Sequence, residues 1–162
     1  MVGMTDDTIL VLGATGKTGR RIIPRLRMRG VAVRAASRSS ATAFDWAAPE
    51  TWDAALAGVR AVYLVAPPWP GPAHDFLARA EALGVQRVVL LSGRGADDYG
   101  DSTFGLDMRS AEDAVRGSAL EWTILRPNNF AQNFDEDIFA ESVAAGELAL
   151  PAGDVPEPFI DL

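Results

Sequence analysis

T-I-L-V-L-G-A-T-G-K-T-G, residues 8–19, is the stretch that decides the fold of this chain. Residues 9–12 are apolar without alternation and run straight into Gly13, a pattern typical of a strand buried on both faces. The segment 17–29 carries apolar residues at helical spacing among arginines, which indicates an amphipathic helix. The sequence therefore predicts a strand, a glycine turn and a helix in direct succession.

Three glycines mark this junction, because Gly16 and Gly19 follow Gly13 at intervals of three residues. In such a junction the first glycine allows the tight turn and the second lets the backbone approach a pyrophosphate. The third lets the helix pack close to the strand. Free N–H groups at the positive end of the helix dipole then favour phosphates. The pattern predicts a dinucleotide-binding loop.

Two other interpretations of the loop are possible. The letters Gly16-Lys17-Thr18 suggest a P-loop, but that motif needs a glycine five positions before Gly16, where Val11 stands. The loop is also too short to wrap a triphosphate, so we reject this interpretation. A glycine turn without a ligand is the plainer alternative. The strand before the loop and the helix after it favour dinucleotide binding.

Composition limits the class of protein. A chain of 162 residues with 48% hydrophobic content predicts one soluble domain with a full core. The start of the chain is short and acidic, and no apolar run is long enough for a membrane span, so we expect a cytoplasmic protein without a membrane partner. The absence of cysteine excludes disulfides, thiolate metal sites and cysteine nucleophiles. A net charge of −7 argues against nucleic-acid binding.

The rest of the chain alternates between apolar runs and amphipathic segments. Further strands are expected at 31–36, 43–44, 61–65, 85–91 and 122–125, and helices at 49–56, 73–83, 106–116 and from 133 or 134 to 145. This alternation predicts an α/β fold, a Rossmann-type doubly wound parallel sheet with helices on both faces. Ligands of such sheets lie outside the carboxyl ends of the strands. Those ends are Gly13, Ser37, Ala66, Ser92 and Arg126.

Six motifs in order identify a family. They are G-A-T-G-K-T-G (13–19), A-S-R-S-S (36–40), F-D-W (44–46), A-V-Y-L-V-A-P-P (61–68), V-V-L-L-S (88–92) and L-E-W-T-I-L-R-P-N-N-F (120–130). Together they resemble the NmrA-like branch of the atypical short-chain dehydrogenases, nearest to the bacterial relatives of the ergot-alkaloid reductases of the festuclavine synthase and agroclavine dehydrogenase type. The resemblance covers nearly the whole chain. It implies a Rossmann domain that binds NAD(P)H and needs no metal.

The resemblance also implies a set of cofactor-binding residues. The glycine loop would hold the pyrophosphate, Ser37 and Arg38 would meet the adenosine ribose, and residues 127–130 would approach the nicotinamide. Ser92 stands where classical members keep a catalytic serine, and we expect it to hydrogen-bond the cofactor or loop backbone. The expected set is Gly13, Ala14, Thr15, Gly16, Lys17, Thr18, Gly19, Ser37, Arg38, Ala66, Pro67, Pro68, Ser92, Pro127, Asn128, Asn129 and Phe130.

The residues after the second strand indicate which cofactor is preferred. Dehydrogenases that use NAD place an acid there to hold the ribose 2′-hydroxyl. This chain has Ser37-Arg38-Ser39-Ser40, and Arg38 can hold a 2′-phosphate bidentately, with Arg34 or Lys17 adding charge. NADP is therefore favoured, with NAD as a possible cofactor. An exposed, solubilising Arg38 is the alternative.

The catalytic tyrosine–lysine pair of short-chain dehydrogenases is absent. Lys17 is the only lysine, and Tyr99 is followed four residues later by Thr103. Hydride transfer to an electron-poor acceptor (an iminium, quinone or flavin-like molecule) needs less proton assistance than ketone reduction, so we expect an acceptor of that kind. No catalytic residue is assigned. The acid–base candidates are Asp107, His74, Tyr99 and Asp101, and Asp107 has the alternative role of serving the start of its helix.

Relatives in this family continue beyond residues 157–162 into a smaller region that completes the substrate pocket. The resemblance therefore implies an NAD(P)-binding domain over 1–150 and, over 151–162, the incomplete start of a C-terminal substrate region. Two functions remain open. One is an NADPH-dependent reductase of a small molecule. The other is a redox-sensing NADP-binding protein of NmrA type that regulates a protein partner.

Overall fold

The computed structural model describes residues 7–150 and 153–162. It has two compact units, one ending at Arg126 and the other beginning at Pro127. This division differs from the boundary expected at residue 150, which stays a prediction about the substrate region. Within the described residues, no helix combines the length and the apolar character needed to cross a membrane.

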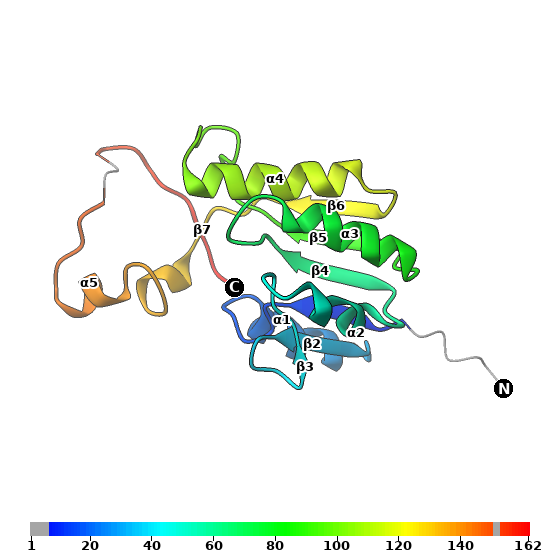
Figure 1. Cartoon of the computed structure of the whole chain (residues 1–162). Helices are drawn as coiled ribbons and strands as arrows, with labels where there is room; N and C mark the ends of the chain where they lie inside the picture. The colour runs from blue at the N-terminus through cyan, green and yellow to red at the C-terminus, as the bar shows by residue number, and fades with distance from the viewer. Residues whose placement is uncertain (1–6, 151–152) are drawn as a thin grey trace. The chain divides into compact units, whose positions relative to one another are not determined.

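The first unit is built on a six-stranded sheet with the order β3-β2-β1-β4-β5-β6 (Figure 1). All neighbouring strands pair in parallel. The strand order reverses beside β1, because β2 and β4 pair with its two edges. The strands are β1 (Ile9–Leu12), β2 (Val33–Ser37), β3 (Thr42–Ala43), β4 (Ala61–Val65), β5 (Arg87–Leu91) and β6 (Glu121–Leu125).

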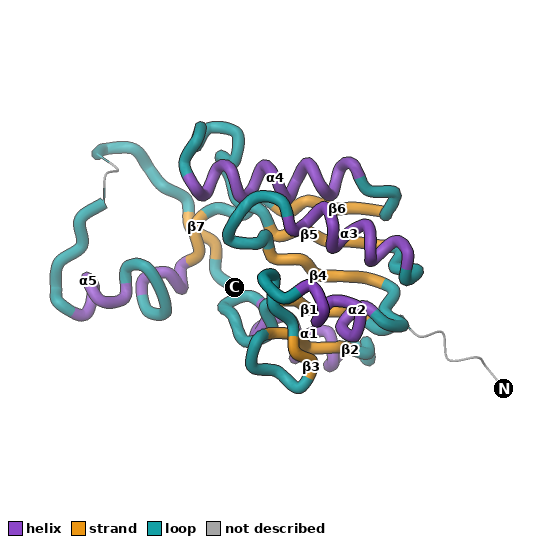
Figure 2. The backbone as a smooth tube through the Cα atoms, viewed as in Figure 1, coloured by secondary structure: helices purple, strands orange, loops and turns teal. Residues whose placement is uncertain are grey.

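Helices connect these strands and cover both faces of the sheet (Figure 2). They are α1 (Gly19–Met28), η1 (Pro49–Thr51), α2 (Trp52–Leu56), α3 (Pro72–Ala82) and α4 (Thr103–Gly117). Because side chains alternate along a strand, Leu10 and Leu12 pack in the core beneath α2–α4, whereas Val11 packs with Ile23 of α1. The predicted doubly wound α/β sheet is confirmed.

Four aromatic side chains fix the segment after β3. Phe44, Trp46, Trp52 and Phe76 pack mainly edge to face, with the Phe44 and Trp46 ring centroids 5.0 Å apart. The indole N–H of Trp52 donates a hydrogen bond of 2.8 Å to the Asp45 carbonyl oxygen. A β3 of only two residues is therefore held by packing against α2 and α3 rather than by a long ladder.

Helix α4 begins earlier than the sequence indicated. Its N-cap is Ser102, whose hydroxyl accepts a hydrogen bond of 3.2 Å from the Gly105 N–H, so the helix begins at Thr103 instead of Leu106. Helix α1 begins at Gly19 rather than Lys17. The glycines and polar residues that precede both helices support turns as readily as helix, which explains these shifts.

The second unit contains the short strands β7 (Asn129–Phe130) and β8 (Phe159–Ile160), which pair in parallel. The helix expected from 133 or 134 to 145 is wrong: the segment forms a 3₁₀ turn η2 (Ala131–Phe134) and a separate helix α5 (Ala140–Ala144). The acidic run at 135–137 lies in the break, and aspartate is a weak helix former. The Phe139 N–H closes the break by donating to the Asn133 carbonyl oxygen.

Prediction for the β1–α1 junction: Gly19→Ala lowers the free energy of unfolding. A Cβ at Gly19 would lie 2.3 Å from the Gly13 carbonyl oxygen and 2.9 Å from the Ala14 Cα, and backbone atoms cannot yield as a side chain can. We expect a loss of about 3 kcal/mol in chemical denaturation, at the upper end of overpacking costs. Gly117→Ala is the control, because nothing lies near its added Cβ. Equal stability of the two variants would contradict the close packing of α1 on β1.

Candidate dinucleotide-binding site

The turn after β1 presents backbone amides at the start of α1. Gly13 has a φ of 65°, and its carbonyl oxygen accepts a hydrogen bond of 2.9 Å from the Gly16 N–H. A Cβ at Gly16 would lie only 3.1 Å from that oxygen. Within the described part of the chain, the N–H groups of Thr15 and Thr18 donate no hydrogen bond. These two amides are therefore available to an anion at the positive end of the helix dipole.

A cavity of about 420 Å³ opens beside this turn, at the carboxyl ends of the strands. Because the strand order reverses at β1, the cavity lies at the switch point where such sheets bind their ligands. Seven of the predicted cofactor-binding residues line it together: Gly13, Thr15, Gly16, Ser37, Arg38, Ala66 and Pro68. Trp69 also lines the cavity.

Among the lining residues outside the predicted cofactor-binding set, three come from one segment. Phe44, Asp45 and Trp46 follow β3, the short edge strand, so its end contributes to the same cavity. Their signal in the sequence was the F-D-W motif after that strand. The Asp45 carboxylate is engaged within its own loop, because its Oδ1 accepts a hydrogen bond of 2.9 Å from the Ala47 N–H.

The segment after β2 forms a tight hydroxyl turn. The Ser37 and Ser40 hydroxyl oxygens are 2.6 Å apart, and the Ser39 N–H donates to Ser37 Oγ at 3.3 Å. Arg38 is exposed at the rim of the cavity. Arg34 is engaged elsewhere, because its guanidinium donates to the carbonyl oxygens of Ala55 and Ala57. Of these two arginines, Arg38 is the one that can meet a ribose phosphate.

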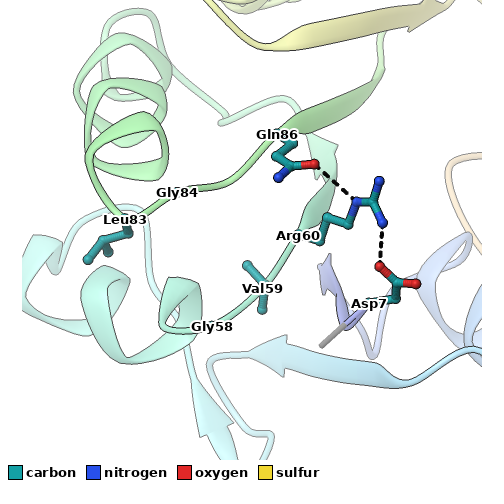
Figure 3. A pocket seen from close by; sticks show the side chains of 7 residues that line it. All are labelled: Asp7, Gly58, Val59, Arg60, Leu83, Gly84 and Gln86. Carbon is teal, nitrogen blue, oxygen red and sulfur yellow. Dashed lines mark hydrogen bonds and ion pairs between the residues drawn. The ribbon is translucent and has the colours of Figure 1, made fainter. Parts of the chain in front are cut away.

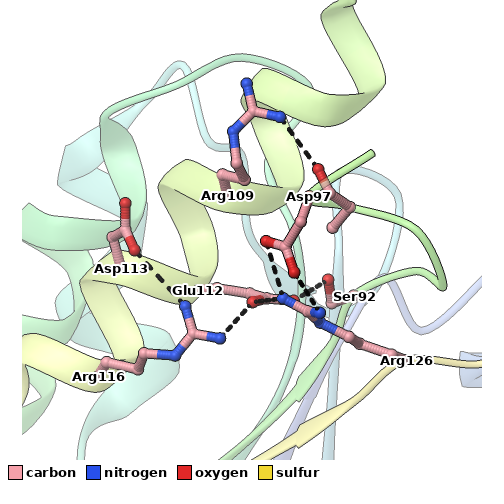
Figure 4. Close-up of polar contacts among 8 residues, drawn as sticks. Ser92, Asp97, Arg109, Glu112, Asp113, Arg116 and Arg126 are labelled. Atoms are coloured by element: carbon pink, nitrogen blue, oxygen red, sulfur yellow. Dashed lines mark hydrogen bonds and ion pairs between the residues drawn. The ribbon is translucent and has the colours of Figure 1, made fainter. Parts of the chain in front are cut away.

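Ser92 lies at the end of β5, where its hydroxyl donates a hydrogen bond of 2.6 Å to Glu112 Oε1 (Figure 4). Glu112 is fully buried on α4. Arg126 binds the same carboxylate bidentately, through Nε at 2.7 Å and Nη2 at 2.6 Å. Arg116 adds a contact of 2.7 Å to Oε2. These contacts join the ends of β5 and β6 to α4. The Ser92 hydroxyl donates its hydrogen bond to the Glu112 carboxylate and not to the loop backbone.

The charge state of Glu112 follows from these partners. Burial raises the pKa of the Glu112 carboxyl, but hydrogen bonds from Arg126 and Ser92 and the charges of Arg126 and Arg116 outweigh it, and the pKa falls to about 2. Glu112 is therefore ionised at neutral pH, and its carboxylate accepts the hydrogen bond that the Ser92 hydroxyl donates. Sequence reasoning missed this residue.

A second cavity of about 430 Å³ lies at the opposite edge of the sheet (Figure 3). Its lining includes Asp7, Arg60 and Gln86, which precede β1, β4 and β5. Arg60 donates to Asp7 Oδ1 at 2.5 Å and to Gln86 Oε1 at 3.2 Å. The amino ends of parallel strands are not where doubly wound sheets bind ligands. We therefore place the site at the other edge.

The structure places the remaining candidate residues in different surroundings. Tyr63 is buried in β4, and burial raises the pKa of its phenol. Tyr99 is 53% exposed, and His74 and Asp101 are exposed. Residues 127–130 belong to the second unit, so their approach to the nicotinamide stays a prediction. Within the described ranges, no three His, Asp or Glu side chains gather as a metal site.

A glycine turn between a buried strand and a helix, free amides and a cavity at the switch point together define a nucleotide-binding Rossmann domain. The chain belongs to the NAD(P)H-binding family, whose model matches residues 13–149. The cofactor class is accordingly NAD(P)H. The free amides and the absence of room for a Cβ at Gly16 and Gly19 fit such a group.

Curated relatives support this assignment. The chain is 35% identical over 170 residues to the uncharacterized oxidoreductase YesF of Bacillus subtilis, covering 98% of this chain and 57% of the relative. It is 35% identical over 173 residues to festuclavine dehydrogenase easG of Aspergillus fumigatus, covering 94% of this chain and 58% of the relative. The predicted resemblance to the ergot-alkaloid reductases is confirmed. The chain spans little more than half the length of these relatives.

A solved structure shares the fold. The NADPH-dependent quinone oxidoreductase QOR2 of Escherichia coli, in complex with NADPH, superposes with a TM-score of 0.68 at 22% identity, covering 85% of this chain and 53% of that chain. At this identity the likeness concerns the fold alone.

Prediction for the charge cluster: Glu112→Gln lowers the free energy of unfolding by about 3 kcal/mol at pH 7, because it removes the buried charge that Arg126, Arg116 and Ser92 all contact. A group with a depressed pKa stabilises the fold above its unfolded value near 4.5 and loses that contribution as pH falls toward 2. The variant should therefore lose less stability than the parent chain over that interval.

Denaturant titrations at pH 7, 5, 4 and 3 test this prediction. Asp113→Asn is the matched control, because Asp113 is the next residue on α4 and its side chain is 71% exposed. An E112Q variant with the stability and acid dependence of D113N would refute the role of the cluster.

Proposed function

We propose that this protein is an NADPH-dependent reductase that transfers hydride to an electron-poor small molecule of the iminium, quinone or flavin-like kind. The observation that carries the proposal is the cavity at the β1 switch point, beside free amides, in a chain without a tyrosine–lysine pair. The bound dinucleotide supplies the hydride. The relatives include an oxidoreductase and a festuclavine dehydrogenase, which supports this reaction class.

The lack of a tyrosine–lysine pair narrows the class of acceptor. Lys17, the only lysine, belongs to the glycine turn, and the Ser92 hydroxyl donates to Glu112. Neither group supplies a proton to a ketone oxygen as the usual pair does. An acceptor that is already electron-poor accepts hydride with less proton assistance. In this proposal the residues of the chain bind and orient the cofactor and the acceptor, and the electron-poor character of the acceptor makes hydride transfer favourable.

The same observations, a nucleotide-binding cavity and a missing tyrosine–lysine pair, also support a second function. A chain that holds a nicotinamide nucleotide but lacks the tyrosine–lysine pair suits a redox sensor that reports the state of the cofactor to a protein partner. Such a protein would bind NADPH without oxidising it in the presence of any acceptor. It would also form a stoichiometric complex with its partner.

Prediction for activity: the protein binds NADPH and oxidises it in the presence of electron-poor acceptors. NADPH fluorescence measures binding, and absorbance at the nicotinamide band measures turnover with a quinone, a flavin, an iminium salt and a plain ketone. We expect turnover with at least one of the first three and none with the ketone. Binding without any turnover would favour the sensor, and no binding of either reduced nucleotide at millimolar concentration would end both proposals.

Prediction for cofactor choice: Arg38→Gln raises the Kd for NADPH about tenfold or more, because a charge-assisted bidentate contact to the 2′-phosphate is lost. The Kd for NADH, which lacks that phosphate, should change less than twofold. Arg87→Gln is the control, since Arg87 is exposed at the amino end of β5 and pairs with Glu121. Equal weakening of both nucleotides would show that Arg38 contacts something other than the phosphate.

A further inference from the structure

Two aromatic side chains, Tyr99 and Phe104, form an exposed pair beside the carboxyl end of β5. Their ring centroids are 5.0 Å apart, and the ring planes are inclined at 74°. Tyr99 is 53% exposed and Phe104 is 42% exposed. Single exposed apolar residues are normal on protein surfaces, whereas two adjacent large rings that stay open to solvent form a candidate contact surface. We call this pair the aromatic corner.

Glycines make room for both rings of the aromatic corner. A Cβ at Gly93, the second residue after β5, would lie closer than 3.0 Å to the tip of the Phe104 ring. A Cβ at Gly105 would lie 3.0 Å from the Tyr99 Cβ, and one at Gly95 would lie 3.2 Å from the Tyr99 ring. Gly105 stands inside α4, where glycine is a weak helix former. The chain therefore keeps glycine at three positions where a larger residue would press on the corner.

The loop that carries Tyr99 is anchored at its centre. Arg109 donates a hydrogen bond of 3.0 Å to the Ala96 carbonyl oxygen, and Arg126 pairs with Asp97 at 2.7 Å. These contacts hold the Tyr99 ring in place before a ligand arrives. A preordered surface of this kind loses little conformational entropy on binding.

Phe104 is held by the start of its helix. It is the second residue of α4, and the cap of that helix is Ser102. The first turn contains no acidic residue, so the expectation that Asp107 serves the start of this helix is wrong. The serine cap fixes the first turn of α4 and with it the Phe104 side chain.

The aromatic corner lies next to the candidate dinucleotide site. Leu91, the last residue of β5, pairs with Val65 of β4, and both Val65 and Ala66 line the cavity at the switch point. Neighbouring strands lie about 5 Å apart, so the end of β5, on which Phe104 packs, borders that cavity. A dinucleotide spans both halves of such a sheet. With its 2′-phosphate beside Arg38, the cofactor directs its nicotinamide toward the ends of β4 and β5.

We propose that the ring system of the hydride acceptor stacks against Tyr99 and Phe104, and that these two residues select flat acceptors of the quinone or flavin-like kind. This inference rests on the proposed reductase function and names a specificity surface for it. The faces of the two side-chain rings are electron-rich, so they attract an electron-poor ring, and the inclined pair offers a face and an edge together.

The same contact favours release of the product. A quinone gains the hydride and one proton from solvent and becomes the hydroquinone, while NADPH becomes NADP⁺. The hydroquinone ring is electron-rich, so its attraction to the aromatic corner is weaker than that of the quinone.

The test compares Tyr99→Ala and Tyr99→Phe with Trp122→Leu, using NADPH and two quinones. Menadione is flat, whereas the bulky groups of di-tert-butyl-benzoquinone keep another ring at a distance. Trp122 is the control, because it is 47% exposed and lies within β6. We expect Y99A to raise KM for menadione about three- to tenfold and Y99F to stay within twofold of the parent. KM for the bulky quinone and the Kd for NADPH should stay within twofold in all three variants.

Stacking is also measured without turnover. Tyr99→Trp places an indole in the aromatic corner, and a quinone that stacks on an indole quenches its fluorescence. In the NADP⁺-loaded protein, menadione should quench the emission that Y99W adds to the parent, and the quenching should saturate. The bulky quinone should leave this added emission unchanged.

Each contrary result is decisive. Equal changes in KM of Y99A for the two quinones, or the same change in W122L, would refute the aromatic corner. A rise in Y99F as large as in Y99A would show that the phenol hydroxyl acts rather than the ring, and would refute stacking too. If the parent protein oxidises NADPH with neither quinone, the reductase function fails. The fluorescence titration of Y99W then decides the corner separately, since the absence of saturable quenching by menadione would overturn it.

Discussion

The close approach of α1 to β1 is the constraint on which the rest of this structure depends. With 2.3 Å between a virtual Cβ at Gly19 and the Gly13 carbonyl oxygen, no side chain fits between helix and strand. The contact fixes the helix start directly over the carboxyl end of β1, and it sets Thr15 and Gly16 beside the cavity. It also seats Ile23 against Val11 on the sheet face opposite to α2–α4. Fold and binding site therefore share one steric requirement.

The sequence predicted the sheet well because its central strands β1, β4 and β5 are mostly apolar on both faces, and such runs have few alternative conformations in a domain of this size. Even the two-residue β3 could be anticipated, although its stability comes from Phe44, Trp46, Trp52 and Phe76, which no local pattern displays. The helix expected near residue 140 failed because its apolar spacing is weak and an acidic run interrupts it. Local helix propensity determined the structure of that segment, because its helix α5 has no buried residue whose packing could outweigh propensity.

The site was predicted in part, for a physical reason. Residues at strand ends follow from topology, so Gly13, Ser37, Arg38 and Ala66 could be assigned to one edge without coordinates. Glu112 could not, because a glutamate on an amphipathic helix is usually solvated. Its signal was the three-residue spacing to Val115 on the buried face of α4. Whether a buried acid is paired, as Glu112 is, depends on residues far away in the sequence, here Ser92 and Arg126.

The charges of the chain are unevenly distributed along its sequence. Residues 8–44 contain eight of the chain's 15 basic residues and none of its 22 acidic ones. This segment forms β1, α1, β2 and β3, the half of the sheet that borders the proposed phosphate positions. Residues 94–113, which include most of α4, contain six acidic residues and two basic ones.

The summed charge of a region attracts ligands of opposite sign before contact, so the basic segment favours an anionic dinucleotide. A protein with a net charge of −7 can in this way still bind a polyanion, because the charge near the binding loop matters more than the charge of the whole chain.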